Sequence, residues 1–352
     1  MYIYVIGTAL SMFFAKLAMN LKKFPALKRS YKVWAILSFL PLTIIGAVRY
    51  NVGTDYEPIY SVLYYSITSG GEGFKEFGFN WLNQFTHIFC ETPALMFGLV
   101  AFLTMLFTFM AYYQQSVNVC MSIYVFVFGM FYFNSLNQIR QALAMAFMTY
   151  AMKYMWRREH WKFFACVLVA SAFHVSSLVY IPVYFLYNLR LNVKVHIVIL
   201  VLATVLQPVA SKLIQFVISL TPYGWYLDSA YSNLGFSLIT FAFAVVMICL
   251  YYYCYLAGKD IEDKQYDTLL HMQLINVLFI LYSAVIPQAD RMAICMTILT
   301  PLMMPKALLR IKEKNKRLVL LLLFTAVFML KLLHDVYWQG WYDVLPYQTL
   351  WS

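Results

Sequence analysis

Long apolar runs separated by short polar loops follow one another along the whole chain. A helix that crosses the ~30 Å hydrocarbon layer of a bilayer needs about 20 mainly apolar residues, with a range of ~17–25. Runs of this kind predict ten membrane-spanning helices, at roughly 2–20, 33–48, 93–113, 119–134, 137–155, 197–213, 236–256, 267–286, 292–309 and 318–335. The pattern therefore predicts an all-α, polytopic membrane protein with a single transmembrane domain over residues 1–352.

The distribution of lysine and arginine indicates how the remaining apolar run, 163–187, is folded. Basic residues cluster in the loops 21–32, 156–162 and 310–317. Because cations concentrate in cytoplasmic loops, all three loops should face the cytoplasm. This is possible only if 163–187 enters the membrane and returns on the same side. We therefore expect a helical hairpin, or a pair of short helices, with a break near His174.

The composition restricts the classes of function that the chain can have. The chain is 63% hydrophobic and 12% charged, with a formal net charge of +11. The cations lie in short loops between spans, which is typical of membrane topology and not of a nucleic-acid-binding surface. The six cysteines are scattered and show no CxxC spacing, so the pattern predicts neither a metal site nor a redox cofactor.

The same topology places two long loops on the outer face, at 49–92 and 214–235. Several charged or titratable residues at predicted helix ends or turns share this face although they are far apart in the sequence. They are Arg49, Asp55, Arg140, His174, Asp290 and Arg291. Ionisable side chains at membrane depth are costly and commonly mark functional sites. Their convergence at one depth predicts a polar site on the outer face.

Each of these side chains also has a structural interpretation. Arg49 can anchor a helix end at the headgroups, and Asp55 can cap the helix that follows it. His174 can be a buried histidine with satisfied hydrogen bonds, and the acid and base at 290–291 can form a local ion pair. Arg140 lies at the outer start of a span, where a cation needs a partner or an anion, and this favours a functional role.

The side chains gathered on the outer face restrict the kinds of reaction that such a site could catalyse. Arginine binds phosphate and diphosphate through bidentate hydrogen bonds, and a histidine or aspartate can accept a proton from an attacking hydroxyl. No nucleotide-sugar is expected outside the cytoplasm, so a donor there must carry its own activation. The set therefore favours a lipid-diphosphate sugar donor, with arginine in place of a metal ion stabilising the departing diphosphate.

At these residues the chain resembles the EpsG family, which is related to the Wzy-type O-antigen, capsule and exopolysaccharide polymerases. The resemblance follows the family order over nearly the whole chain. Its pieces are Arg49 with Gly53-Thr54-Asp55-Tyr56 and Tyr60, Glu76-Phe77-Gly78-Phe79, Asn137 to Gln141, Ala170-Ser171-Ala172-Phe173-His174-Val175-Ser176-Ser177, Asp290-Arg291 and Leu345-Pro346-Tyr347.

The resemblance implies a GT-C-like membrane glycosyltransferase. Such an enzyme joins undecaprenyl-diphosphate-linked repeat units on the outer face of the bacterial cytoplasmic membrane, and a chain-length regulator can accompany it. The implied catalytic residues are His174, Asp55 and Arg140, and either His174 or Asp55 is the base. The implied substrate-binding residues are Arg49, Tyr56, Tyr60, Glu76, Gln141, Asp290 and Arg291. No metal ion, cofactor or nucleic acid is implied.

Three other functions stay open. A flippase for the same lipid-linked unit also needs cations and many spans, but its cations should line a path at mid-membrane. An O-antigen ligase uses the same donor chemistry with a different acceptor. A membrane acyltransferase with a catalytic His174 would use a cytoplasmic acyl donor, and it leaves the arginines unexplained.

Overall fold

The computed structural model describes residues 1–352 except 222–223, 229–235, 259–260 and 352. The described residues are helical or irregular, apart from one isolated antiparallel bridge between Arg49 and Thr349. Two compact units make up the chain. Unit 1 contains Met1–Leu178 and Thr325–Ser352, and unit 2 contains Val179–Phe324. The prediction of an all-α, multi-pass helical membrane protein is confirmed.

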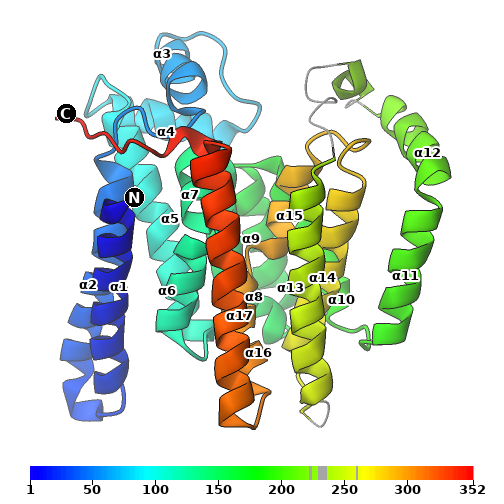
Figure 1. Ribbon diagram of the computed structural model, residues 1–352. Helices are drawn as coiled ribbons and strands as arrows, with labels where there is room; N and C mark the ends of the chain where they lie inside the picture. The colour runs from blue at the N-terminus through cyan, green and yellow to red at the C-terminus, as the bar shows by residue number, and fades with distance from the viewer. Residues whose placement is uncertain (222–223, 229–235, 259–260, 352) are drawn as a thin grey trace. The chain divides into compact units, whose positions relative to one another are not determined.

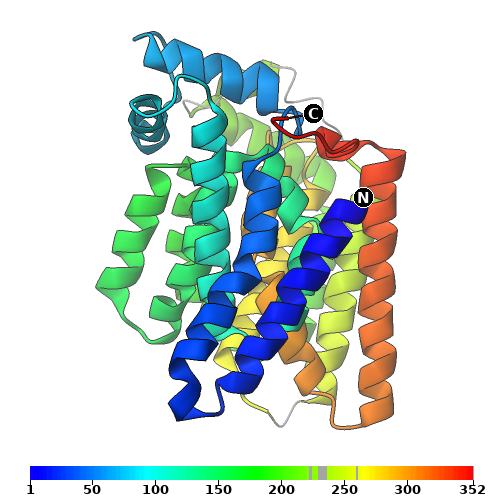
Figure 2. The same cartoon turned by 90° about the vertical axis from the view of Figure 1, so that its left-hand side faces the viewer.

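Unit 1 is a bundle of long helices with a cap of short ones. Its long helices are α1 (Tyr2–Leu21), α2 (Lys28–Ala47), α5 (Ala94–Gln115), α6 (Val119–Phe128), α8 (Ile139–Trp156), α9 (His160–Ser171) and the second half of α17 (Lys314–Leu332). The short elements are η1 (Pro25–Leu27), η2 (Tyr56–Ser61), α3 (Val62–Thr68), α4 (Phe77–His87), α7 (Phe131–Asn137), η3 (Val175–Val179), η6 (Leu333–Trp338) and η7 (Trp341–Asp343). Figures 1 and 2 show α3, α4 and the C-terminal segment at one end of this bundle.

Unit 2 is built from the remaining helices. They are α10 (Tyr180–Leu186), α11 (Val193–Val205), α12 (Gln207–Ser219), η4 (Gly224–Asp228), α13 (Leu238–Ala257), α14 (Lys264–Leu281), α15 (Ala289–Thr297), α16 (Thr300–Leu309) and the first half of α17. Buried polar contacts join several of them. His196 of α11 lies 2.9 Å from His271 of α14 and 2.5 Å from the Tyr252 hydroxyl of α13. Residues 222–223 and 229–235 of the predicted outer loop 214–235 lie outside the described residues.

Among the described residues, five helical segments are long and apolar enough to cross a bilayer, and three bent pairs bring the number to eight if each pair is one span. The predicted spans at 119–134, 197–213 and 292–309 correspond to these bent pairs, which bend by 55°, 80° and 43° respectively. Proline lies in the first turn of α12 and of α16, where its missing N–H and fixed φ suit the start of a new helix. At the first bend, Met130 adopts a left-handed φ of 73° before α7.

Two further predicted helices, at 137–155 and 267–286, are present as α8 and α14. Both carry polar side chains that are buried inside the protein, among them Gln141 and Lys153 of α8 and His271 and Gln273 of α14. These side chains make the two helices less apolar than the other spans. A helix surrounded by protein can contain such residues, because neighbouring helices supply their hydrogen bonds.

The apolar run 163–187 is divided as predicted into two short helices. Helix α9 ends at Ser171, and the chain passes through η3 before α10 begins at Tyr180. The break is closed by local bonds: the backbone N–H of Ser177 and its hydroxyl both donate to the carbonyl of His174, at 3.2 and 3.0 Å. His174 therefore lies at the turn, where the sequence predicted it.

Candidate functional site

The C-terminal segment covers the loop that follows α2. Arg49 pairs with Thr349 in the isolated antiparallel bridge. On either side of this bridge, the N–H of Tyr50 donates to the carbonyl of Gln348 and the N–H of Leu350 donates to the carbonyl of Val48, each at 3.0 Å. We call residues 342–350 the strap, because Gly53 and Thr54 also donate to it. The strap leaves Arg49 only 2% exposed.

Arg49 is a buried cation held mainly by neutral groups. It donates to the carbonyl of Leu136, and its guanidinium lies 5.3 Å from the ring centre of Phe97 and 5.8 Å from that of Tyr56. No carboxylate forms an ion pair with it among the described residues. Burial lowers the pKa of Arg49. Aromatic faces and a carbonyl compensate part of the cost of such a buried charge.

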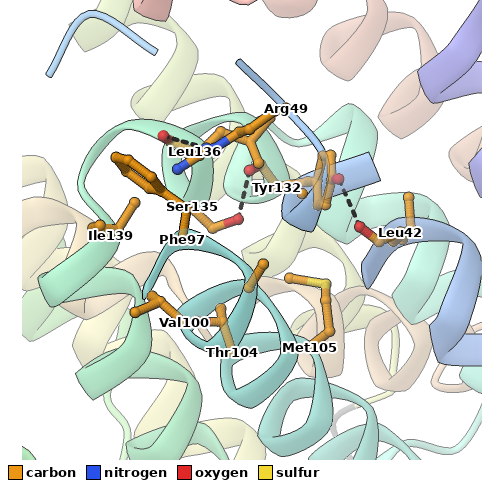
Figure 3. Close-up of a pocket in the computed structure, with 12 residues that line it drawn as sticks. Leu42, Arg49, Phe97, Val100, Thr104, Met105, Tyr132, Ser135, Leu136 and Ile139 are labelled. Atoms are coloured by element: carbon orange, nitrogen blue, oxygen red, sulfur yellow. Dashed lines mark hydrogen bonds between the residues drawn. The ribbon is translucent and has the colours of Figure 1, made fainter. Parts of the chain in front are cut away.

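A small cavity lies between Arg49 and the bundle interior (Figure 3). Its volume is about 10 Å³, and Thr104 of α5 and Ser135 of α7 are among its polar lining residues. A volume of this size holds about one water molecule. It is far too small for a sugar diphosphate, so this cavity belongs to the packing around Arg49 and is not a substrate pocket.

Asp55 lies at the start of η2, but its side chain forms no capping hydrogen bond there. Its φ and ψ of −86° and −1° are already helical, and an N-cap residue normally has an extended conformation. The backbone N–H of Asp55 instead donates to the side-chain oxygen of Asn137 at 2.9 Å. The capping interpretation of Asp55 is therefore wrong, and its backbone contact joins the loop 49–92 to the end of α7.

Aromatic side chains pack against Tyr56 and Tyr60, the two tyrosines that the resemblance implied as substrate-binding residues. Tyr56 stacks on Phe97 of α5 with ring centres 4.0 Å apart, and Tyr60 lies 5.8 Å from Phe74. Both tyrosines are at least 95% buried. Burial raises the pKa of Tyr56 to about 12, so its phenol is neutral at physiological pH. These two residues position the loop 49–92 on α5 and expose little surface on which a sugar ring could stack.

Arg140 and Glu76 form an ion pair between two distant segments. Arg140 lies in the first turn of α8, and one of its terminal nitrogens is 2.6 Å from Oε2 of Glu76. The side chains are 15% and 12% exposed, respectively. The Arg140 guanidinium also stacks 3.9 Å above the centre of the Phe74 ring. Oε1 of Glu76 accepts the N–H of Val175 at 3.3 Å, so Glu76 links Arg140 to the break that contains His174.

His174 has a defined hydrogen-bonding pattern at its Nδ1 atom. The N–H of Ser176 donates to Nδ1 at 3.3 Å, and the Ser176 hydroxyl lies 2.7 Å from the same atom. Nδ1 is therefore an acceptor, and a neutral imidazole carries its proton on Nε2. The break is also packed against α4, because the N–H of Gly78 donates to the carbonyl of Ala172 at 2.9 Å. A Cβ on Gly78 would lie 2.7 Å from that carbonyl oxygen.

Within unit 1 the structure brings part of the predicted set together. Glu76 contacts both Arg140 and the His174 break, and Arg49, Asp55, Tyr56 and Tyr60 pack in the same unit. Gln141 is 2% exposed within α8. Asp290 is exposed at the start of α15 and Arg291 follows it, but both lie in unit 2.

Sequence reasoning missed two features of unit 1. The first is Phe74, which stacks on Arg140; in the sequence, only its position two residues before Glu76 could have drawn attention to it. The second is a cluster on α17 and η6, where Asp335 pairs with Lys331 and lies 2.8 Å from Nδ1 of His334. The i, i+4 spacing of Lys331 and Asp335 is a recognisable helical ion-pair signal. Within the described chain, no three His, Cys, Asp or Glu side chains gather closely enough to hold a metal ion.

The fold and the site define a class: a multi-pass helical membrane protein with an arginine–carboxylate pair at the capped end of one bundle. The family assignment is more specific. The model of the EpsG family matches residues 32–349, nearly the whole chain, and the protein belongs to this family. EpsG-family proteins are Wzy-like polymerases, so the family implies a glycosyltransferase-like, exopolysaccharide-type polymerase. No curated protein and no solved structure matches the chain significantly.

Proposed function

We propose that the protein joins undecaprenyl-diphosphate-linked oligosaccharide repeat units into a polysaccharide on the outer face of the bacterial cytoplasmic membrane. The family supports the general reaction class. The observation that carries the finer proposal is the pairing of Arg140 with Glu76 beside the His174 break. This cluster contains a phosphate-binding side chain, a carboxylate and a histidine on three separate segments.

Arg140 is suited to hold the donor diphosphate. A guanidinium has five N–H donors in a planar fork. One terminal nitrogen of Arg140 donates to Glu76, and its Nε is buried without a partner among the described residues. The side chain is 15% exposed, so its remaining terminal N–H groups are the donors proposed for phosphate oxygens, and the Phe74 ring below fixes the plane of the guanidinium. Glu76 orients Arg140 and keeps it extended toward the outer loop.

The proposed reaction is a direct group transfer. A hydroxyl of the lipid-linked acceptor unit attacks the anomeric carbon of the donor chain, and the bond from that carbon to the diphosphate oxygen breaks. The hydroxyl proton passes to a base, and lipid diphosphate leaves with its charge stabilised by Arg140. Asp55 is one candidate base. His174, whose Nδ1 is already an acceptor for Ser176, presents an Nε2–H that suits donation to a substrate oxygen.

The position of the cluster supports a transferase over a flippase. Arg140, Glu76 and the His174 break belong to the end of unit 1 that carries the outer loop and the strap. A flippase needs its polar groups along a path across the membrane. A ligase would use the same donor site, so only the identity of the acceptor separates it from a polymerase.

The test is reconstitution with a purified lipid-linked repeat unit. Wild-type protein should produce a ladder of polymer, whereas Arg140→Ala should leave single units, with a rate lower by about 10²–10³-fold. The matched control is Lys75→Ala, which removes an exposed cation next to Glu76 in the loop 49–92. Normal polymer from Arg140→Ala would contradict the proposed role of Arg140. Translocation of the unit without bond formation would establish the flippase instead.

A further inference from the structure

Unit 2 contains an apolar groove between α13 and the beginning of α17. Its volume is about 560 Å³, within the range of small-molecule sites. The lining residues are Val245, Val246, Cys249, Leu250 and Tyr253 of α13 and Asn315, Lys316, Val319, Leu320 and Leu323 of α17. Eight of the ten are apolar, and the two polar ones occupy neighbouring positions at the start of α17. The groove is thus an apolar channel with one polar end.

Both walls of the groove belong to membrane spans. Helix α13 and the segment Lys314–Trp338 are each long and apolar enough to cross a bilayer. Large apolar lining residues stay open to the surroundings, since Val246 is 44% and Leu323 is 46% exposed. In a bilayer the surroundings at this depth are hydrocarbon, so the occupant that matches the walls is an aliphatic chain.

The polar end of the groove has an excess of positive charge. The loop and first turn at 312–317 contain Lys312, Lys314, Lys316 and Arg317, with Glu313 as the acid among them. Lys316 lines the groove itself, and its ammonium lies 2.6 Å from Glu313 at an exposed position. Basic residues next to a membrane attract anionic lipid headgroups. The charge therefore selects an anionic headgroup over a zwitterionic one.

We propose that this groove binds an anionic phospholipid, with one acyl chain between α13 and α17 and the phosphate beside Lys316. The proposal rests on the groove and its charge, and it does not depend on the polymerase reaction. Such a lipid would fill the space between two spans of unit 2 that side chains leave open.

Native mass spectrometry of the purified full-length protein tests this proposal. The protein is titrated with phosphatidylglycerol or with phosphatidylcholine of the same chain length. We expect one phosphatidylglycerol to be retained preferentially. Cys249→Trp places an indole inside the groove and should weaken retention at least about tenfold, while Leu322→Trp, at an exposed α17 position outside the lining, should leave it unchanged. Lys316→Gln should weaken retention about fivefold.

Lys314→Gln is the control for charge, because Lys314 lies in the same basic segment but does not line the groove. Equal affinity for the two phospholipids would overturn the headgroup assignment. Equal loss in Cys249→Trp and Leu322→Trp would overturn the groove as the binding site. Displacement of phosphatidylglycerol by an equimolar polyprenyl phosphate would overturn the occupant and assign the groove to a polyprenyl chain.

Discussion

Gly53→Ala tests how tightly the Arg49 loop is fitted to the bundle. Gly53 has a φ of +111°, and a Cβ there would lie 2.7 Å from the carbonyl oxygen of Leu136. The same oxygen accepts the hydrogen bond of Arg49. A left-handed φ costs an alanine roughly 1–2 kcal/mol, and overpacking against the backbone adds ~1–3 kcal/mol. We therefore expect Gly53→Ala to destabilise the protein by about 2–5 kcal/mol.

Gly70→Ala provides the matched comparison. Gly70 also has a positive φ, of +83°, but a Cβ there would meet nothing within 4 Å. Its substitution should therefore cost only the conformational part, about 1–2 kcal/mol. The difference of ~1–3 kcal/mol corresponds to roughly 2–12 °C in the melting temperature of a unit of this size. Scanning fluorimetry in detergent at one scan rate measures it, and equal melting temperatures for the two variants would refute this reasoning.

The remaining predictions concern charged and titratable groups of unit 1. Glu76→Gln leaves Arg140 without its counter-ion, and we expect about 1–3 kcal/mol of destabilisation and shorter polymer, measured by melting and by gel analysis of product length. Burial raises the pKa of Tyr56 to about 12 in the folded state, against about 10 in the unfolded state, so the contribution of Tyr56 to stability should be complete below pH 10 and be lost as the pH rises through 12. Tyr56→Phe should remove at most ~2.7 kcal/mol of this alkaline loss, measured as the free energy of unfolding from chemical denaturation at each pH. Lys331→Met should cost roughly 3 kcal/mol by leaving the buried Asp335 carboxylate with His334 as its remaining partner, and a further Asp335→Asn should recover part of it in a double-mutant cycle.

Each of these predictions has a control on the same surface. Glu72→Gln removes an exposed acid from the loop 49–92 and should change neither the melting temperature nor the polymer length. Tyr50→Phe changes a phenol that is 47% exposed and should leave the alkaline loss of stability intact. For the α17 cluster, additive effects of the two substitutions would contradict a direct pairing of Lys331 with Asp335.

Hydrophobic patterning predicted the helices, because an apolar run is a local property, and the placement of cations in loops along the chain predicted the break. A span needs about 20 apolar residues, and charge parity required 163–187 to enter and return. The bends in three predicted spans escaped this reasoning. A proline in a first turn allows either a kink in one helix or the start of another, and Met130 adopts its left-handed φ without a residue type that favours it.

Part of the candidate site could also be predicted. Arg140 and His174 were expected at one end of the bundle, and their link through Glu76 agrees with that expectation. The strap could not be predicted, since it pairs backbone groups about 300 residues apart and backbone pairing leaves no side-chain pattern. The sequence therefore indicated which residues carry charge, but it did not indicate that the strap buries Arg49.

Arg49 and Arg140 have the same side chain in different surroundings, and these surroundings indicate different roles. Arg49 is 2% exposed and enclosed by the strap and two aromatic faces, so a ligand could reach it only after the strap moved. Arg140 is 15% exposed and paired with a carboxylate. In the proposed reaction a diphosphate and Glu76 share the N–H donors of Arg140. Glu76 would still accept the N–H of Val175, so donor binding would change the charge felt at the His174 break through one shared carboxylate.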